Sequence, residues 1–239
     1  MSSRRFRLFV ILGIGVTSLL LAIAYLQFYI ARPIGSGPAG PAVSPDPFEK
    51  MWTEQHVLLL GIGDSITAGL GAKNTSHSYF QRLISNPTDE FEDMKGVCLS
   101  RVLPNLQTRN LAISGSTSIT HAEIVGEKLE TQPTDVYGIV VMTTGGNDLI
   151  HSYGRSPARE GAMFLATMEQ AKPWIENFEK RLNTMLDTIT AKFPGGCEIH
   201  LADIYYWFYE NVEDPNDRGY DAIGRLFMNS IITHSKLLP

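Results

Sequence analysis

A buried strand followed by a tight turn is predicted by the stretch Val57-Leu58-Leu59-Leu60-Gly61-Ile62-Gly63-Asp64-Ser65-Ile66-Thr67-Ala68-Gly69-Leu70. The apolar residues at its start are typical of a strand that is covered on both faces, and the glycines that follow favour a turn. Ser65 comes directly after that turn. Ligands gather at the carboxyl ends of parallel strands, and the first N–H groups of the next helix lack partners there. The pattern therefore places Ser65 where a nucleophile would be exposed.

Strands and helices alternate along the rest of the chain. Further strands are predicted at residues 106–113, 136–142 and 198–204, and helices at 78–85, 119–129, 173–192 and 221–238. Pro173 stands at the predicted start of its helix, a position that tolerates proline. Strands separated by helices predict an α/β fold with a parallel sheet that is covered by helices on both faces.

Each of the first three predicted strands ends in polar or glycine-rich sequence. Gly63-Asp64-Ser65 follows the first strand, the segment from Asn110 to Thr117 contains Ser114-Gly115-Ser116, and Gly145-Gly146-Asn147-Asp148 follows the third. A serine that attacks a carbonyl needs hydrogen-bond donors at the oxyanion that develops. The backbone N–H groups of Ser65 and Gly115 and the side-chain amide of Asn147 can supply these donors, since glycine permits close approach and asparagine carries an NH₂ group.

These three segments resemble the sequence blocks of the SGNH (GDSL-type) hydrolases. Gly63-Asp64-Ser65-Ile66-Thr67 is similar to the block that carries the nucleophile, 110–116 to the block that supplies the oxyanion-hole glycine, and 145–148 to the block that supplies the asparagine. The resemblance spans roughly residues 56–205. Three blocks in order, each behind a predicted strand, are a specific signal.

The resemblance implies a flavodoxin-like three-layer α/β/α sandwich with Ser65 as nucleophile and with Gly115 and Asn147 in the oxyanion hole. It implies hydrolysis of esters or thioesters, or deacetylation of carbohydrates, without metal or cofactor. The expected substrate is a small-molecule, lipid or glycan ester, and the reaction passes through an acyl-enzyme.

The general base departs from the family pattern. These hydrolases place it in an Asp-x-x-His sequence after the last strand, and a serine hydroxyl is a weak nucleophile without such a base. Of the six histidines only His151 has an aspartate three residues before it, Asp148, and this pair follows the third strand. We count four strands where the family has five. We therefore hypothesise that the sequence is truncated before its last strand and that the base lies beyond residue 239. The alternative is that His151 is a relocated base.

Two classes of function remain open at this stage. The first is an ester hydrolase that acts through Ser65. The second is a catalytically inactive SGNH domain that binds glycans or lipids. The simplest structural interpretation of Ser65 alone is a residue that caps the following helix.

The N-terminus predicts a membrane anchor. Arg4, Arg5 and Arg7 precede residues 8–31, which contain no charge. These 24 residues can cross a hydrocarbon core of about 30 Å at about 1.5 Å per residue. Residues 1–7 would then stay in the cytoplasm and the domain would be extracytoplasmic. Alternatively, the segment is a signal peptide that is cleaved near Ala24, which would leave the domain secreted.

The composition of the remaining chain limits its partners. Residues 32–47 are rich in proline and glycine and predict a linker to a domain at 48–239. Four of the 20 basic residues lie in 1–32, so the rest of the chain contains 16 basic and 25 acidic residues. This acidic balance argues against nucleic acid as a partner. Cys98 and Cys197 form a disulfide or are simply buried, and two cysteines far apart do not suggest a metal site.

Overall fold

The chain forms two separate units. The computed structural model describes residues 3–26, 37–151, 155, 157–202 and 216–239. The units are Met1–Gly37 and Pro38–Pro239, and the first contains helix α1 (Ser3–Tyr25). Within the described residues, none of the helices combines the length and the apolar character that a membrane crossing requires. Residues 27–31 of the predicted 8–31 span lie outside the described residues.

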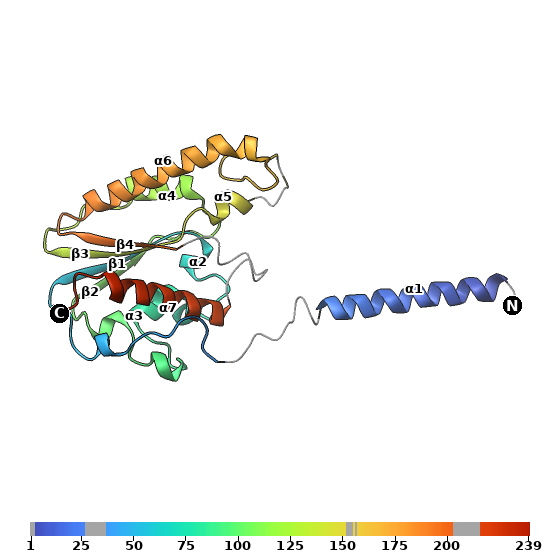
Figure 1. Ribbon diagram of the computed structural model, residues 1–239, viewed down its shortest axis with the longest axis horizontal. Coiled ribbons are helices and arrows are strands. Elements are labelled where there is room, and N and C mark those ends of the chain that lie inside the picture. The colour runs from blue at the N-terminus through green and yellow to red at the C-terminus, as the bar shows by residue number, and fades with distance from the viewer. Residues whose placement is uncertain (1–2, 27–36, 152–154, 156, 203–215) are drawn as a thin grey trace. The chain divides into compact units, whose positions relative to one another are not determined.

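The second unit is built on a four-stranded parallel sheet (Figure 1). Its strands are β1 (His56–Ile62), β2 (Leu106–Asn110), β3 (Val136–Met142) and β4 (Cys197–Leu201). The strands lie in the order β2-β1-β3-β4, which matches the first four positions of the flavodoxin-like order 2-1-3-4-5. The predicted α/β fold with a parallel sheet is thereby confirmed.

Helices connect the strands and cover the sheet. The α-helices are α2 (Ser65–Ala68), α3 (Tyr79–Ile84), α4 (Ser118–Glu127), α5 (Gly146–Ile150), α6 (Met168–Lys192) and α7 (Asp217–His234). Short 3₁₀ turns are η2 (Asp46–Phe48), η3 (Thr75–His77), η4 (Glu92–Met94) and η5 (Leu99–Arg101). In Figure 1, α4 and α6 lie on one side of the sheet, and α3 and α7 lie on the other.

The alternation of side chains along β1 divides the core into two parts. Leu58 and Leu60 pack in a cluster with residues of α4 and α6, whereas Leu59 packs in a second cluster with residues of α3 and α7. Successive side chains of a strand point to opposite faces, so a strand that is covered on both faces is apolar throughout. The layered arrangement follows directly from the uninterrupted apolar run in the sequence.

Helix α6 begins earlier than its sequence predicts. The prediction took Pro173 as the first residue, but the helix starts at Met168 and Pro173 lies inside it. Thr167 and Gln170 form a capping box in which each side chain accepts a hydrogen bond from the other residue's backbone N–H. These bonds satisfy N–H groups of the first turn, and the chain therefore enters the helix five residues before the proline.

Other boundaries also differ from the prediction, among them the end of α7, which is at His234 and not at residue 238. Strand β2 ends at Asn110 rather than 113, because the Asn110 side chain accepts a hydrogen bond from the backbone N–H of Ala112 and the chain turns there. Helix α7 begins at Asp217, where the Asn216 side chain caps it through the backbone N–H of Gly219. Strand β4 ends at Leu201, and the predicted residues 203–204 lie outside the described part of the chain.

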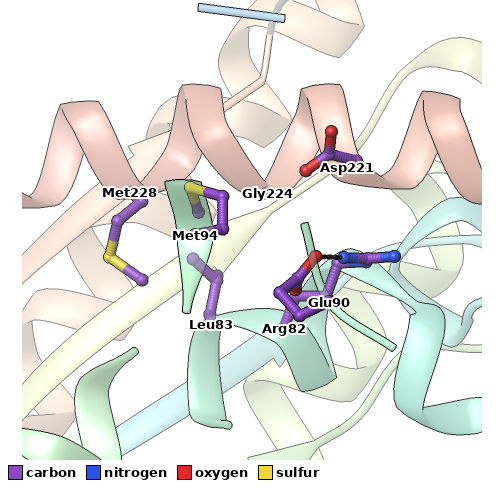
Figure 2. Close-up of a pocket in the computed structure, with 7 residues that line it drawn as sticks. All are labelled: Arg82, Leu83, Glu90, Met94, Asp221, Gly224 and Met228. Atoms are coloured by element: carbon purple, nitrogen blue, oxygen red, sulfur yellow. Dashed lines mark hydrogen bonds and ion pairs between the residues drawn. The ribbon is translucent and has the colours of Figure 1, made fainter. Parts of the chain in front are cut away.

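Buried charges hold α7 against the rest of the unit. Arg82, on α3, pairs with Glu90 in a small pocket between α3 and α7, whose lining Figure 2 shows. Arg225, on α7, donates to Asp221 at 2.9 Å and to the two carboxylate oxygens of Asp93 at 2.6 and 3.0 Å. A buried guanidinium is tolerated when carboxylates surround it in this way.

Part of the predicted linker lies against the second unit. The backbone N–H of Ala39 donates to the Asp221 carboxylate at 2.8 Å, and the side chain of Asn229 donates to the carbonyl of Ala42 at 3.0 Å. Val43 is buried in the cluster that contains α3 and α7. Residues 38–47 of the segment predicted as a tether are thus fixed to α7, although their composition is typical of a free linker.

The two cysteines are free thiols. Cys98 is buried at the start of η5, and Cys197 is half-buried in β4. Burial raises the pKa of the Cys197 thiol. The sequence left open a disulfide or two buried thiols, and in the structure the two cysteines are not paired.

Candidate active site

Three loops meet at the carboxyl ends of β1, β2 and β3. The backbone N–H of Ile113 and the hydroxyl of Ser116 both donate to the carbonyl of Gly63, at 2.9 and 3.2 Å. The side-chain amide of Asn147 donates to the carbonyl of Ser116 at 2.9 Å. Strand β1 lies between β2 and β3, so the sheet changes its direction of winding at this point. Open α/β sheets bind their ligands in such a crevice.

Ser65 is the first residue of α2. Asp64 caps this short helix, because its carboxylate accepts a hydrogen bond from the backbone N–H of Ile66 at 3.0 Å. The cap is therefore Asp64 and not Ser65, which removes the simplest structural role for the serine. Ser65 is half-buried, and its hydroxyl has no hydrogen-bond partner among the described residues.

A chain of buried hydroxyl groups supports Asp64 from below. Thr143 donates to the Asp64 carboxylate at 3.2 Å, the Thr67 and Thr143 hydroxyls lie 2.7 Å apart, and the Thr67 and Tyr79 hydroxyls also lie 2.7 Å apart. Since a carboxylate only accepts, each hydroxyl donates to the next one toward Asp64. Burial raises the pKa of Tyr79, which therefore keeps its proton and is the first donor in this series of hydrogen bonds. The four groups fix the turn that presents Ser65.

Position 63 requires glycine because the hydroxyl groups of Thr143 and Thr67 lie too close for a Cβ atom. A Cβ atom at position 63 would lie 2.3 Å from the hydroxyl oxygen of Thr143, 2.5 Å from that of Thr67 and 2.8 Å from the carbonyl oxygen of Thr143. We expect Gly63→Ala to lower the free energy of unfolding by about 1–3 kcal/mol, because the turn and β3 must move apart. Urea unfolding of the two proteins measures this difference.

Gly126→Ala is the matched control for this prediction. A Cβ atom at Gly126, in α4, would meet no atom within 4 Å, so this alanine is expected to be neutral or stabilising by up to about 1 kcal/mol. Equal losses of stability in both variants would show that the contacts at Gly63 do not matter.

Gly115 presents its backbone at the second loop. It is exposed, and its φ angle of 79° lies in the left-handed region that favours glycine. The turn is closed by the backbone N–H of Ser116, which donates to Ile113 at 3.1 Å. Within the described part of the chain the N–H of Gly115 has no hydrogen-bond partner. It is thus an exposed donor on the loop that contacts Gly63.

Asn147 is the second residue of α5 and faces the second loop. One hydrogen of its side-chain NH₂ group points to the carbonyl of Ser116, the residue that follows Gly115. A Cβ atom at the neighbouring Gly146 would lie 3.7 Å from the Asp64 carboxylate, so α5 also begins beside the turn of Ser65. The structure therefore brings the loops of Ser65, Gly115 and Asn147 together.

An ion-pair network anchors the helix of Asn147. The buried carboxylate of Asp148 accepts from the backbone N–H of Ser118 at 2.8 Å and from its hydroxyl at 2.5 Å. Arg181, on α6, donates to the Ser118 hydroxyl at 2.9 Å and to Glu160 at 2.8 Å. The Arg181 guanidinium lies 3.7 Å from Asp148 and offsets its charge. Helices α4, α5 and α6 are tied together directly behind the candidate site.

His121 is a buried residue at the site that the sequence does not reveal. Its ring nitrogens lie 2.6 Å from the Ser116 hydroxyl and 2.7 Å from the Thr144 hydroxyl. Burial lowers its pKa to about 4, although the charge of Asp148 and the carbonyl of Gly63 both oppose this shift. The imidazole is therefore neutral at neutral pH. The sequence offers no signal for its role, because its partners are distant residues or belong to other elements.

The lowered pKa of His121 predicts a loss of stability in acid. A histidine that is free in the unfolded chain binds a proton near pH 6.5, whereas the folded protein binds it only near pH 4. The unfolded state thus takes up more protons as the pH falls from about 6.5 to about 4, which lowers the free energy of unfolding by at most about 3 kcal/mol. We expect His121→Gln, which cannot titrate, to lack this component. Urea unfolding at pH 7, 5.5 and 4 measures it, and parallel curves for the two proteins would contradict it.

The comparison with protein families decides the identity. The model of the GDSL-like Lipase/Acylhydrolase family matches residues 62–227, which is more than half of the chain. The chain belongs to this family. The match runs from the last residue of β1 into α7 and includes Ser65, Gly115 and Asn147. It confirms the resemblance that the three sequence blocks indicate, and it makes the chain an ester hydrolase by family.

Two solved structures are distantly similar to this chain. An acetylxylan esterase from Geobacillus stearothermophilus, solved as a catalytic mutant, is 18% identical, with a TM-score of 0.40 over 77% of this chain and 75% of that one. Phospholipase A1 from Streptomyces albidoflavus is 14% identical, with a TM-score of 0.34 over 76% and 75% of the two chains. Among curated proteins, no match was found.

The ring contacts of the described histidines are all with groups other than Ser65. His77 contacts Asp89, His200 contacts Ser230, and His234 contacts the carbonyl of Ser230. His151 ends α5, where its backbone N–H donates to the carbonyl of Asn147 at 2.8 Å. Among the described residues, therefore, no imidazole is hydrogen-bonded to the serine. The three sequence blocks of the GDSL-like family are therefore present, and no described residue is assigned as the general base.

Proposed function

We propose that the chain hydrolyses carboxylic esters through an acyl-enzyme at Ser65. The observation that carries the proposal is the convergence of the three loops of the candidate site. A hydroxyl without a partner, an exposed backbone N–H and a side-chain amide come from elements that are hydrogen-bonded to one another. This is the donor set that acyl transfer from a serine requires.

In the proposed reaction the oxygen of Ser65 attacks the ester carbonyl and its proton passes to a base. The carbonyl oxygen becomes an oxyanion, which the N–H groups of Ser65 and Gly115 and the second amide hydrogen of Asn147 stabilise. Collapse of this intermediate breaks the bond to the alcohol, which leaves with the proton that the base took from Ser65. Water then attacks the acyl-enzyme by the same route, releases the acid and restores Ser65.

Exposed apolar side chains around these loops support a substrate with an apolar part. Ile113 is 42% exposed, Ile119 is 38% exposed and Leu149 is 39% exposed. They lie on the second loop, at the start of α4 and on α5. An acyl chain or an apolar alcohol bound beside Ser65 would remove these surfaces from water, which favours binding by about 25 cal/mol per Å².

Covalent labelling tests the proposal. A fluorophosphonate reacts with an activated serine, so the full chain is expected to take up one phosphonyl group, which peptide mapping would locate on Ser65. Ser85→Ala, a change at an exposed serine outside the site, is expected to label at the same rate. Labelling that is absent, or that occurs on another serine, would overturn the proposal.

The second candidate function is a glycan- or lipid-binding module. It is favoured because no imidazole in the described part of the chain is hydrogen-bonded to Ser65, and a serine without a base is a poor nucleophile. A chain that binds an ester ligand in calorimetry, yet neither hydrolyses it nor labels with the fluorophosphonate, would be this module.

We also propose that residues 8–31 anchor the domain to a membrane with the domain on the extracytoplasmic side. The uncharged segment behind three arginines supports this, as do the exposed apolar side chains of α1, among them Phe9, Ile11 and Leu12. The full chain is expected to remain in the membrane fraction after alkaline carbonate washing, and the domain to be open to protease from outside the cell. Release by the wash would contradict the anchor, and protection from protease would contradict the orientation.

A further inference from the structure

His121 bridges the second and third loops of the candidate site, and Ser116 links it to the first loop. It belongs to α4, and none of its side chain is exposed. One ring nitrogen, Nε2, faces the hydroxyl of Ser116, and the other, Nδ1, faces the hydroxyl of Thr144. Ser116 follows Gly115, whereas Thr144 follows β3 and precedes the loop of Asn147. The proposed reaction gives this imidazole no role.

The hydrogen bonds around Ser116 determine where the imidazole carries its proton. The Ser116 hydroxyl lies 2.6 Å from the carbonyl of Ile113 and 3.2 Å from the carbonyl of Gly63. Both carbonyls can only accept, so they take the single hydroxyl hydrogen of Ser116. The Ser116 oxygen must therefore accept a hydrogen bond from Nε2–H of His121. Nδ1 is then unprotonated and accepts from the Thr144 hydroxyl.

We infer that His121 is a positioning residue for the oxyanion hole, whose neutral imidazole fixes Ser116 and thereby sets Gly115 and Asn147 around Ser65. Ser116 is the point through which it acts. Its hydroxyl binds Gly63, its carbonyl accepts the amide of Asn147, and its backbone continues from Gly115. This inference rests on the proposed function, since it assigns the donors that Ser65 chemistry would use.

Protonation would disturb this arrangement. A second proton on the ring would sit on Nδ1 and face the Thr144 hydroxyl, which now donates to that nitrogen and would have to turn. The charge of Asp148, on α5, favours protonation of His121, and Arg181, on α6, pairs with Asp148 and offsets that charge. Burial keeps the pKa of His121 at about 4, so the bridge is intact at neutral pH.

The first test is the rate of fluorophosphonate labelling at Ser65 in the full chain. His121→Ala removes both ring contacts and is expected to slow the labelling at neutral pH at least 10-fold, at a temperature where the variant remains folded. His121→Gln keeps a donor that can reach Ser116 and is expected to recover part of the rate. His56→Ala changes an exposed histidine at the amino end of β1, the opposite end of the strand from Ser65, and is expected to leave the rate unchanged. Equal rates in His121→Ala and the wild type would overturn the inference.

The second test does not depend on reactivity. In ¹⁵N NMR spectra the ring is expected to show a proton on Nε2 and none on Nδ1 at neutral pH. His121→Ala is expected to shift the signals of the Gly115 N–H and the Asn147 side-chain NH₂, and His56→Ala is not. Unmoved signals would overturn the positioning role. If the wild-type chain does not label at all, the proposed function fails, and these spectra alone decide the role of His121.

Discussion

Ser65→Ala is expected to abolish ester hydrolysis and fluorophosphonate labelling. Loss of the nucleophile from a serine hydrolase lowers kcat by about 10⁴- to 10⁶-fold, because no other group can form the acyl-enzyme. Fold stability is expected to change by less than about 0.5 kcal/mol, since Ser65 is half-buried and its hydroxyl has no partner among the described residues. Hydrolysis of a p-nitrophenyl ester, followed by absorbance, measures the loss.

The outcome separates the nucleophile from a structural serine. If Ser65 only supported α2, the alanine would destabilise the turn and leave hydrolysis in proportion to the folded fraction. Ser85→Ala is again the control, with unchanged kcat. Full activity in folded Ser65→Ala would contradict the assignment of the nucleophile.

Asn147→Ala is expected to lower kcat by about 10²- to 10³-fold with little change in KM. The amide donor is needed at the oxyanion, which exists only in the transition state and the tetrahedral intermediate. A donor that acted equally on the bound ester would raise KM instead. Steady-state kinetics with the same p-nitrophenyl ester separate the two effects.

A matched variant controls for the loss of an amide hydrogen bond. Asn229, on α7, donates to the carbonyl of Ala42 at 3.0 Å, much as Asn147 donates to Ser116 at 2.9 Å. Asn229→Ala therefore removes an equivalent bond outside the site and is expected to leave kcat unchanged. If both variants lost activity equally, the effect of Asn147 would be one of stability and not of catalysis.

The fold could be predicted because its strands are buried on both faces. Residues 136–142 are a β-branched apolar run, and β3 occupies this range without change. The start of α6 could not be predicted from Pro173, because the capping box of Thr167 and Gln170 starts the helix five residues earlier, at Met168. Local patterns identify elements well, but two competing local signals at one helix end need the structure to rank them.

The candidate site was predicted where the signal is local. Ser65, Gly115 and Asn147 each follow a strand, and parallel strands bring their carboxyl ends to one edge. The supporting contacts are long-range and leave no pattern in the sequence. Thr143 and Thr67 are 76 residues apart and share a hydrogen bond, and His121 is 23 residues from Thr144. Contacts between residues so far apart in the sequence can be identified only from the folded structure, in which the sheet brings the loops together.

The most direct measurement is a crystal structure of the chain after reaction with a fluorophosphonate. The phosphonyl group is a tetrahedral mimic of the acyl-transfer intermediate, and its oxygen takes the place of the oxyanion. We predict that the group is bonded to Ser65 and that this oxygen lies within about 3.2 Å of both the Gly115 nitrogen and the Asn147 side-chain nitrogen. A phosphonyl oxygen that points away from both donors, or a Ser65 oxygen turned away from the second and third loops, would contradict the account.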